Sequence, residues 1–320
     1  MRLPPLPALA LALAAALLLT SCSLKAAPPA APAPIPPPAA PTPVLPTPAP
    51  QPEARLLLSP VEVPQGGVVV VRLTGSEAGT AQSPRLEAGG EAQSMTPVSK
   101  DWVTLLPVSY AATPGPRDLI VTLAGRRWTA QFTVTRRPFP VSRVYVSDEK
   151  GNLLTDPQAD RDAERIAQIK AKLSPVPLWR GAFGWPVTGN ITTAFGLIRY
   201  VNDKEEGRHS GLDIAAPEGK PVLAPAAGRV VLADKLVVTG YTVILDHGLG
   251  LFTSYSHMKS FQVKVGQMLQ KGDVIGAVGE TGLATGPHLH WTVSIGSTPT
   301  DPATFLKGDP LAASPPATTP

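Results

Sequence analysis

The sequence has a single cysteine, Cys22, among its 320 residues. No internal disulfide can therefore form, and a closed structural zinc site, which normally uses four protein ligands and often cysteine, is disfavoured. No long basic stripe with interleaved aromatic residues occurs, so nucleic-acid binding is not indicated. Lys and Arg exceed Asp and Glu by 28 to 24. A solvated surface explains this balance as well as binding to an anionic polymer such as a cell wall does.

The first 22 residues, MRLPPLPALALALAAALLLTSC, contain one basic residue and an apolar stretch that ends at Leu19. The stretch is shorter than the roughly 20 apolar residues of a spanning helix, and its layout is typical of a secretory signal peptide. The ending Leu-Thr-Ser-Cys resembles the bacterial lipoprotein box. We therefore expect residues 1–21 to be a lipoprotein signal peptide and Cys22 to be lipidated and to anchor the protein to a membrane. The alternatives are an ordinary signal peptide and an uncleaved anchor.

Much of the abundant proline, 39 residues in all, gathers in residues 22–53 and in the tail 309–320. These segments should be an extended spacer after the lipidated cysteine and a disordered tail. Residues 54–136 consist of short β-branched runs broken by Gly, Pro and Ser, which predicts a small antiparallel, immunoglobulin-like β-sandwich. One hairpin is expected over Leu119–Val134, turning at Ala124-Gly125. The sandwich lacks convergent chemistry, so we expect it to act as a spacer or to bind an envelope protein partner.

Residues 137–180 are predicted to be a connector that contains a short helix. Asp156 can cap this helix, Pro157 suits its first position, and Ser174-Pro175 should stop it. Its expected apolar stripe consists of Ala159, Ala163, Ile166, Ile169 and Leu173. Residues 181–308 return to strands and glycine turns, including an expected hairpin over Val263–Val278 that turns at Lys271-Gly272-Asp273. The sequence as a whole therefore predicts a mainly β protein.

All five histidines lie in the segment 181–308. Two of them stand in HLH, where strand alternation would point His288 and His290 to one face and send Leu289 and Trp291 into the core. Their Cβ atoms would then lie about 7 Å apart. This pair could share one metal ion or one reacting group, and it could equally be an ordinary pair at a sheet surface.

A second cluster, RHSGLDIAAPEG, supplies His209 and Asp213. Gly211 and Pro217 argue against a helix here, so the imidazole and the carboxylate should share a face of an extended segment. Together with one imidazole of HLH they would give zinc three protein ligands and leave a fourth position open.

The motif HExxH is absent, so another group must transfer the proton. The remaining imidazole of HLH and His257 are the candidates, because histidine titrates near neutral pH. Glu280 and Asp246 are weaker alternatives, since both sit in glycine turns.

The motifs ITTAFG, HSGLDIAAPEGKPVLAPAAGRV, TVILDHG, YSHM and VKVGQMLQKGDVIGAVGETGLATGPHLH resemble, in this order, those of lysostaphin-type (LytM-like) zinc metalloendopeptidases of bacterial cell walls. The resemblance runs from about Phe183 to Phe305 and implies an antiparallel β metallopeptidase domain of the duplicated hybrid motif type. It also implies that His209, Asp213 and His290 bind one Zn²⁺ per chain, while His257 and His288 assist the reaction.

Two further positions follow from the same resemblance. His247 lies in the DHG turn that the family carries outside the metal site, and we expect it to be structural. Thr292 departs from the family, because many members have an acidic residue there. We expect this difference to tune the surroundings of the metal ligands or the fit of the substrate without abolishing activity.

The sequence thus predicts a zinc-dependent endopeptidase that hydrolyses peptide cross-links of peptidoglycan with zinc-activated water and histidine acid–base help. Its predicted location is the cell envelope, with the lipid on Cys22 holding it to a membrane. The alternative is a catalytically inactive module that binds peptidoglycan and activates another hydrolase. The complete histidine and aspartate set favours the enzyme.

Overall fold

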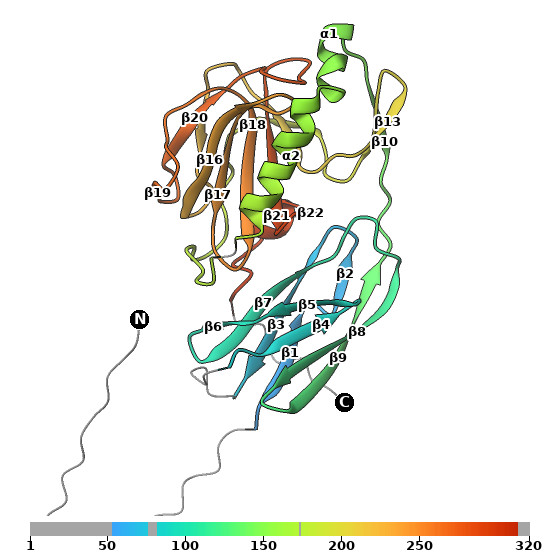
Figure 1. Cartoon of the computed structure of the whole chain (residues 1–320), viewed down its shortest axis with the longest axis vertical. Coiled ribbons are helices and arrows are strands. Elements are labelled where there is room, and N and C mark those ends of the chain that lie inside the picture. Colours follow the sequence, from blue (N-terminus) through green and yellow to red (C-terminus); the bar gives the residue numbers. More distant parts are fainter. Residues whose placement is uncertain (1–52, 76–81, 173, 313–320) are drawn as a thin grey trace, which may run out of the picture. The chain divides into compact units, whose positions relative to one another are not determined.

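The computed structural model describes residues 53–75, 82–172 and 174–312 (Figure 1). The predicted signal peptide, Cys22 and nearly all of the spacer lie outside these residues, as does the tail from residue 313. These described residues belong to one compact unit. In this described part the chain is mainly β, as predicted from the sequence.

The first nine strands form two sheets that face each other. The four-stranded sheet has the order β1 (Arg55–Ser59), β3 (Val68–Thr74), β7 (Asp101–Pro107) and β6 (Thr96–Val98). The five-stranded sheet has the order β2 (Glu62–Pro64), β9 (Arg126–Thr135), β8 (Gly115–Leu123), β4 (Arg85–Ala88) and β5 (Glu91–Ser94). Residues of both sheets share one buried apolar cluster, so this part is a β-sandwich.

The predicted hairpin of the sandwich is confirmed. Strands β8 and β9 pair antiparallel down to Leu123 and Arg126, on either side of Ala124-Gly125. Both turn residues have positive φ, 48° and 79°, as a two-residue turn that matches the twist of the strands requires. Alternate residues of β8, including Leu119 and Val121, enter the core.

Strand β3 is buried on both of its faces. Its run of four valines, residues 68–71, divides between two clusters: Val69 and Val71 pack inside the sandwich. Val68 and Val70 join a larger apolar cluster that includes Phe195 and Phe305 of the C-terminal part. A continuous apolar run is the pattern of a strand buried on both faces. The sandwich therefore shares part of its core with the sheet that follows it.

Polar contacts reinforce this junction. Arg137 forms an ion pair with Asp301 at 2.7 Å. The backbone N–H of Asp301 also donates to the carbonyl of Gly66. Gly66 has φ of +85° and lies so close to the ring of Phe195 that a Cβ would clash with it. These contacts fix the turn before β3 against the C-terminal part.

The connector contributes a strand and three short helical elements. Strand β10 (Val141–Val144) forms a small sheet with β12 (Ile198–Val201) and β13 (Lys204–Arg208). After it come α1 (Asp148–Gly151), the 3-10 helix η1 (Asn152–Leu154) and α2 (Pro157–Lys170). The predicted start of α2 is confirmed, because the Asp156 carboxylate accepts the N–H of Gln158 at 2.7 Å.

The predicted apolar stripe of α2 is partly wrong. Ile166 and Ile169 pack on a cluster of the large sheet, but Ala163 is exposed. The fifth predicted member, Leu173, lies outside the described residues. The buried positions are Asp162, which accepts the N–H of Val237, and Lys170. Two polar contacts to the sheet thus set the rotation of the helix, which the apolar pattern alone could not reveal.

The remaining strands form the large sheet, which has ten strands in the described chain. Its main order is β11 (Asn190–Thr193), β14 (Leu212–Ala215), β21 (His288–Ile295), β18 (Leu251–Phe261), β17 (Gly240–Asp246), β16 (Gly228–Leu236) and β19 (Met268–Leu269). Off this path lie β15 (Pro221–Leu223), β20 (Val274–Val278) and β22 (Thr298–Thr300), and helix α3 (Ala303–Leu306) follows. All its pairings are antiparallel.

The predicted hairpin over Val263–Val278 is wrong. Strand β19 pairs with β16, whereas β20 pairs with β15 and β18. Two turns at Gly266 and Gly272, with φ of +88° and +93°, leave β19 only two residues long. Such a short strand joins a distant neighbour instead of the next strand in sequence.

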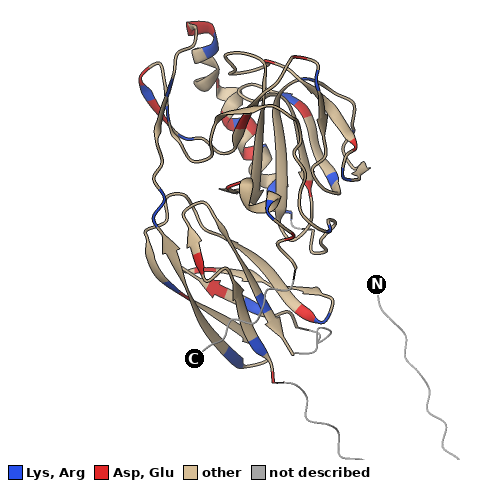
Figure 2. Ribbon diagram, turned by 180° about the vertical axis from the view of Figure 1, so that it is seen from behind, with Lys and Arg blue, Asp and Glu red and all other residues tan. Residues whose placement is uncertain are grey.

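Charges are mixed over the surface. Figure 2 shows Lys and Arg interspersed with Asp and Glu on the ribbon of both the sandwich and the large sheet. Every helix in the described part of the chain is too short or too polar to cross a bilayer.

Candidate metal centre

Two neighbouring strands of the large sheet bring a carboxylate and an imidazole face to face. Strand β14 pairs antiparallel with β21 so that Asp213 lies directly opposite His290, and Ala215 opposite His288. Side chains of directly opposed residues stand on the same face of a sheet. As predicted, Leu289 and Trp291 are fully buried on the other face. The HLH motif is therefore a strand that presents both imidazoles to the same side.

His209 reaches the same place from the segment between β13 and β14. Its backbone N–H donates to the carbonyl of Leu197, and a bend at Gly211 separates it from β14. A Cβ on Gly211 would lie 2.2 Å from the carbonyl oxygen of Trp291. The expected extended segment is thus interrupted, and the glycine allows the close backbone approach that brings His209 above Asp213.

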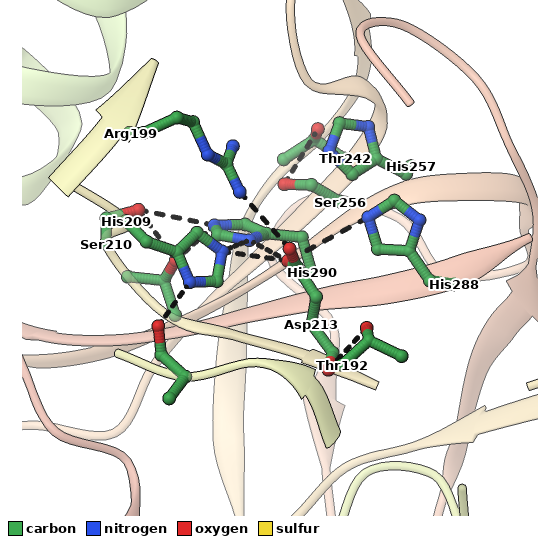
Figure 3. Close-up of polar contacts among 12 residues, drawn as sticks. Thr192, Arg199, His209, Ser210, Asp213, Thr242, Ser256, His257, His288 and His290 are labelled. Atoms are coloured by element: carbon green, nitrogen blue, oxygen red, sulfur yellow. Dashed lines mark hydrogen bonds and ion pairs between the residues drawn. The ribbon is translucent and has the colours of Figure 1, made fainter. Parts of the chain in front are cut away.

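His209, Asp213 and His290 converge on a small buried volume (Figure 3). Nε2 of His209 lies 2.9 Å from Oδ1 of Asp213 and 3.0 Å from Nδ1 of His290. Nδ1 of His290 lies 2.7 Å from the same Oδ1. Possible ligand atoms of the three predicted residues, from the segment 209–213 and from β21, are therefore brought together.

The hydrogen bonds around these residues leave lone pairs facing one another. Nδ1 of His209 donates to the carbonyl of Ala194 at 2.8 Å, so Nε2 of the neutral ring is an acceptor. Nε2 of His290 lies 3.0 Å from the Thr292 hydroxyl and 3.2 Å from the Ser210 hydroxyl. Donation to either oxygen leaves Nδ1 as an acceptor.

The electrostatics of Asp213 complete this donor set. Burial raises the pKa of the Asp213 carboxyl, but in the metal-free protein hydrogen bonds donated by the imidazoles of His209 and His290, when these rings carry the protons, outweigh burial and hold the pKa well below its usual range. The carboxylate is therefore ionised. When the facing nitrogens of both imidazoles are unprotonated, three acceptor atoms at contact distance repel one another unless a cation lies between them, so the donor set fits a metal ion.

The two other predicted site residues flank this group. His257 and His288 have ring centroids 4.9 Å apart, and the ring of His257 lies 5.9 Å from that of His290. Nδ1 of His257 donates to the carbonyl of Thr281, and Nδ1 of His288 to that of Gly286, each at 2.8 Å. Both rings in their neutral form therefore have a lone pair on Nε2, and Nε2 of His288 lies 3.8 Å from Oδ1 of Asp213.

His257 is held in an unusual backbone conformation. Its φ is 60°, and β18 carries an irregularity here in its pairing with β17. Left-handed backbone is uncommon for residues other than glycine and clusters at functional sites. Burial, with smaller contributions from the neighbouring histidines, lowers the pKa of His257 to about 3. The ring is thus neutral at pH 7.

A cleft opens beside the metal-ligand group. It consists of a cavity of about 330 Å³ that includes Asp213, His257 and His288, and a cavity of about 210 Å³ that includes His209, His257 and His290.

The connector forms part of the wall of this cleft, which sequence reasoning missed. Val144 and Val146 line the larger cavity and Leu154 the smaller one. The Lys150 ammonium holds the connector to the opposite loop through the carbonyl of Ala284 and the carboxylate of Glu280. Arg199, which lines both cavities, was also missed, because nothing in the sequence distinguished it from other arginines.

The other titratable candidates lie apart from this group. Glu280 is partly exposed in its ion pair with Lys150, and Asp246 accepts from Ser174 and from the N–H of Gly248. His247 is fully buried between the carbonyl of Ala227 and the hydroxyl of Thr253. Burial lowers its pKa to about 4, so it is a neutral hydrogen-bonding residue of the core.

Comparison with known proteins agrees with this geometry. The sequence model of peptidase family M23 matches residues 207–302. The crystal structure of a Pseudomonas aeruginosa protein described as "putative peptidase M23" is 31% identical and has a TM-score of 0.56. The similarity covers 76% of this chain and 93% of that one. The chain belongs to peptidase family M23. The predicted resemblance to lysostaphin-type enzymes is thereby confirmed at the level of the family.

This M23 chain is also similar to curated proteins. It is 35% identical over 158 residues to the cell division protein DipM of Caulobacter vibrioides. This match covers 47% of this chain and 25% of DipM. It is also 40% identical over 146 residues to the DD-carboxypeptidase/endopeptidase Mpg of Neisseria meningitidis. That match covers 46% of this chain and 32% of Mpg. The M23 chain thus spans a quarter to a third of the length of these relatives.

Proposed function

We propose that the protein is a zinc-dependent endopeptidase that hydrolyses peptide cross-links of bacterial peptidoglycan. The observation that carries this proposal is the convergence of three acceptor atoms, from His209, Asp213 and His290, in a cleft that two further histidines border. Zinc is the metal of choice for two imidazoles and one carboxylate, and three protein ligands are typical of catalytic zinc sites. A further relative, 36% identical over 107 residues, is named the peptidoglycan DD-endopeptidase ShyB of Vibrio cholerae, and this name supports a peptidoglycan substrate.

His209, Asp213 and His290 would hold the ion, which would supply Lewis acidity to the scissile carbonyl and to a water molecule. The protein residues provide the proton transfer. In their neutral forms His257 and His288 each carry a lone pair on Nε2 at the cleft, so one of them can take a proton from water and pass it to the leaving amine. The other can donate to the developing oxyanion once it is protonated.

A regulator without catalytic activity is the second candidate. The connector, which lines the cleft and is fixed to the opposite loop by Lys150, narrows access to the histidines. A protein of this kind would bind peptidoglycan and activate a separate hydrolase. The intact set of five site residues favours the enzyme.

The test uses the purified full-length chain loaded with Zn²⁺ and defined cross-linked peptidoglycan fragments, with products identified by mass spectrometry. Cleavage should stop with a chelator and in His290→Ala, and it should persist in the control Glu280→Gln. His257→Ala and His288→Ala should each lose about 10²–10⁴-fold in kcat while they still bind zinc. Cleavage that survives both the chelator and His290→Ala would remove the metal from the reaction. No cleavage, combined with stimulation of a separate hydrolase, would establish the regulator.

We also propose that the protein works in the cell envelope, held to a membrane by a lipid on Cys22. The layout of the first 22 residues supports this location. Metabolic labelling with a fatty acid should mark the full-length protein and should fail in Cys22→Ser. Equal labelling of both would refute the anchor. The segments 54–136, 137–180 and 181–308 are proposed as the sandwich, the connector and the metallopeptidase domain.

A further inference from the structure

The guanidinium of Arg199 reaches the metal-ligand group from the small sheet. Its Nη2 donates to Oδ2 of Asp213 at 3.2 Å, which is its one hydrogen bond within the described residues. Its side chain is 24% exposed, so this ion pair is largely shielded from water. Figure 3 shows Arg199 and His288 approaching Asp213 from different sides.

The two oxygens of Asp213 have different partners. Both imidazoles of the metal-ligand group contact Oδ1, at 2.9 and 2.7 Å. Oδ2 faces Arg199 instead. The carboxylate is therefore oriented so that one oxygen points to the ligand nitrogens while the other is held by the guanidinium.

Arg199 is itself held in place by the connector. Strand β12 lies between β10, which comes from the connector, and β13, and Arg199 pairs with Ser142 of β10. Alternation sends Arg199 and Val201 to the cleft. Tyr200 points the other way, where its hydroxyl donates to Glu205. The small sheet thus fixes the direction of the guanidinium.

We infer that Arg199 is a positioning residue that limits Asp213 to one metal-binding oxygen. This inference rests on the zinc-binding part of the proposed function. With Oδ2 held by Arg199, the carboxylate offers only Oδ1 to the ion and leaves a coordination position for water. The positive charge of Arg199 also withdraws electron density from the carboxylate. Without Arg199, Oδ2 is free to bind the ion and to take that position.

The test replaces Arg199 with Met, which keeps the length and removes the donors, and with Lys, which keeps the charge and one donor. Arg143→Ala is the matched control, because Arg143 lies in the same small sheet and pairs with Asp203 but is half exposed. The full-length proteins are loaded with Co²⁺, whose visible absorption is stronger in four-coordinate than in five-coordinate sites. Zinc affinity, kcat and KM are measured on the same proteins.

Arg199→Met should lose the intense visible absorption and about 10–100-fold in kcat, with KM unchanged. It should bind zinc at least as tightly as the wild type, because it gains an oxygen ligand and loses a nearby positive charge. Arg199→Lys should recover part of the absorption and of kcat, and Arg143→Ala should match the wild type. If Arg199→Met does not fold, Arg199→Gln should show the same loss.

Unchanged absorption in metal-bound Arg199→Met would overturn this inference alone. A rise in KM without a change in kcat would also overturn it and would make Arg199 a substrate contact. A wild-type protein that binds neither Co²⁺ nor Zn²⁺ would overturn the proposed function, and this inference with it.

Discussion

The buried amine of Lys170 should destabilise the folded protein at neutral pH. Lys170 is 7% exposed, and its ammonium donates to the Ser294 hydroxyl at 3.0 Å. Burial lowers its pKa from 10.5 to about 8. Each pKa unit corresponds to about 1.4 kcal/mol, so holding the charge in this site costs about 3 kcal/mol of folding free energy.

The cost depends on pH in a defined direction. Below pH 8 both the folded and the unfolded states are charged at Lys170, and the folded state carries the full penalty. Between pH 8 and 10.5 the folded state loses the proton first, so the free energy of unfolding rises with pH. Above 10.5 both states are neutral and the penalty has gone.

The free energy of unfolding of Lys170→Met, measured relative to that of the wild type, should therefore be about 3 kcal/mol higher at pH 7 than at pH 10.5. The Ser294 hydroxyl loses its donor at every pH, which costs about 1–3 kcal/mol and leaves this difference unchanged. Urea unfolding of the metal-free full-length proteins at the two pH values measures this difference. Lys172→Met is the control, because Lys172 is exposed. An advantage of Lys170→Met that is the same at pH 7 and pH 10.5 would refute the reasoning.

Three further predictions concern the metal centre and the core. Gly211→Ala should lower the unfolding midpoint and weaken zinc binding, because the added Cβ would lie 2.2 Å from the backbone of β21. The control Gly308→Ala, which has open space around it, should do neither. Normal zinc affinity in Gly211→Ala would contradict this prediction. Thr292→Val removes the hydroxyl next to Nε2 of His290 and should weaken zinc binding about 10-fold. Thr292→Ser should bind zinc about as tightly as the wild type, and competition with a chelator measures both affinities. His247→Ala should lose about 2–4 kcal/mol of stability in urea unfolding and keep its zinc affinity, and a loss of zinc would place it in the site.

Features with a local origin could be predicted from the sequence. The alternation of HLH with Leu289 and Trp291 fixes which side chains share a face, because a strand repeats every two residues. The turn at Ala124-Gly125 and the start of α2 at Asp156 depend on neighbouring residues only. The choice of His290 over His288 as the third metal ligand followed from a family resemblance and not from spacing.

Features that depend on distant partners could not be predicted. Strand β19 joins β16 because register between remote strands decides its place, and no local pattern records that register. Helix α2 exposes Ala163 because Asp162 and Lys170 find partners on the large sheet. Arg199 escaped notice because its importance comes from the pairing of β12 with the connector, which only the folded chain reveals.

The valines of β3 have a practical consequence for anyone who trims this chain. The segment matched by the family begins at residue 207, so an obvious short version would discard both the sandwich and Phe195. A version that starts after residue 137 would instead remove Val68 and Val70 from the apolar cluster that contains Phe195. Either truncation exposes apolar surface that is buried between the sandwich and the large sheet, and such a surface favours self-association. Low activity of the fragment would then say little about the chemistry of the intact protein.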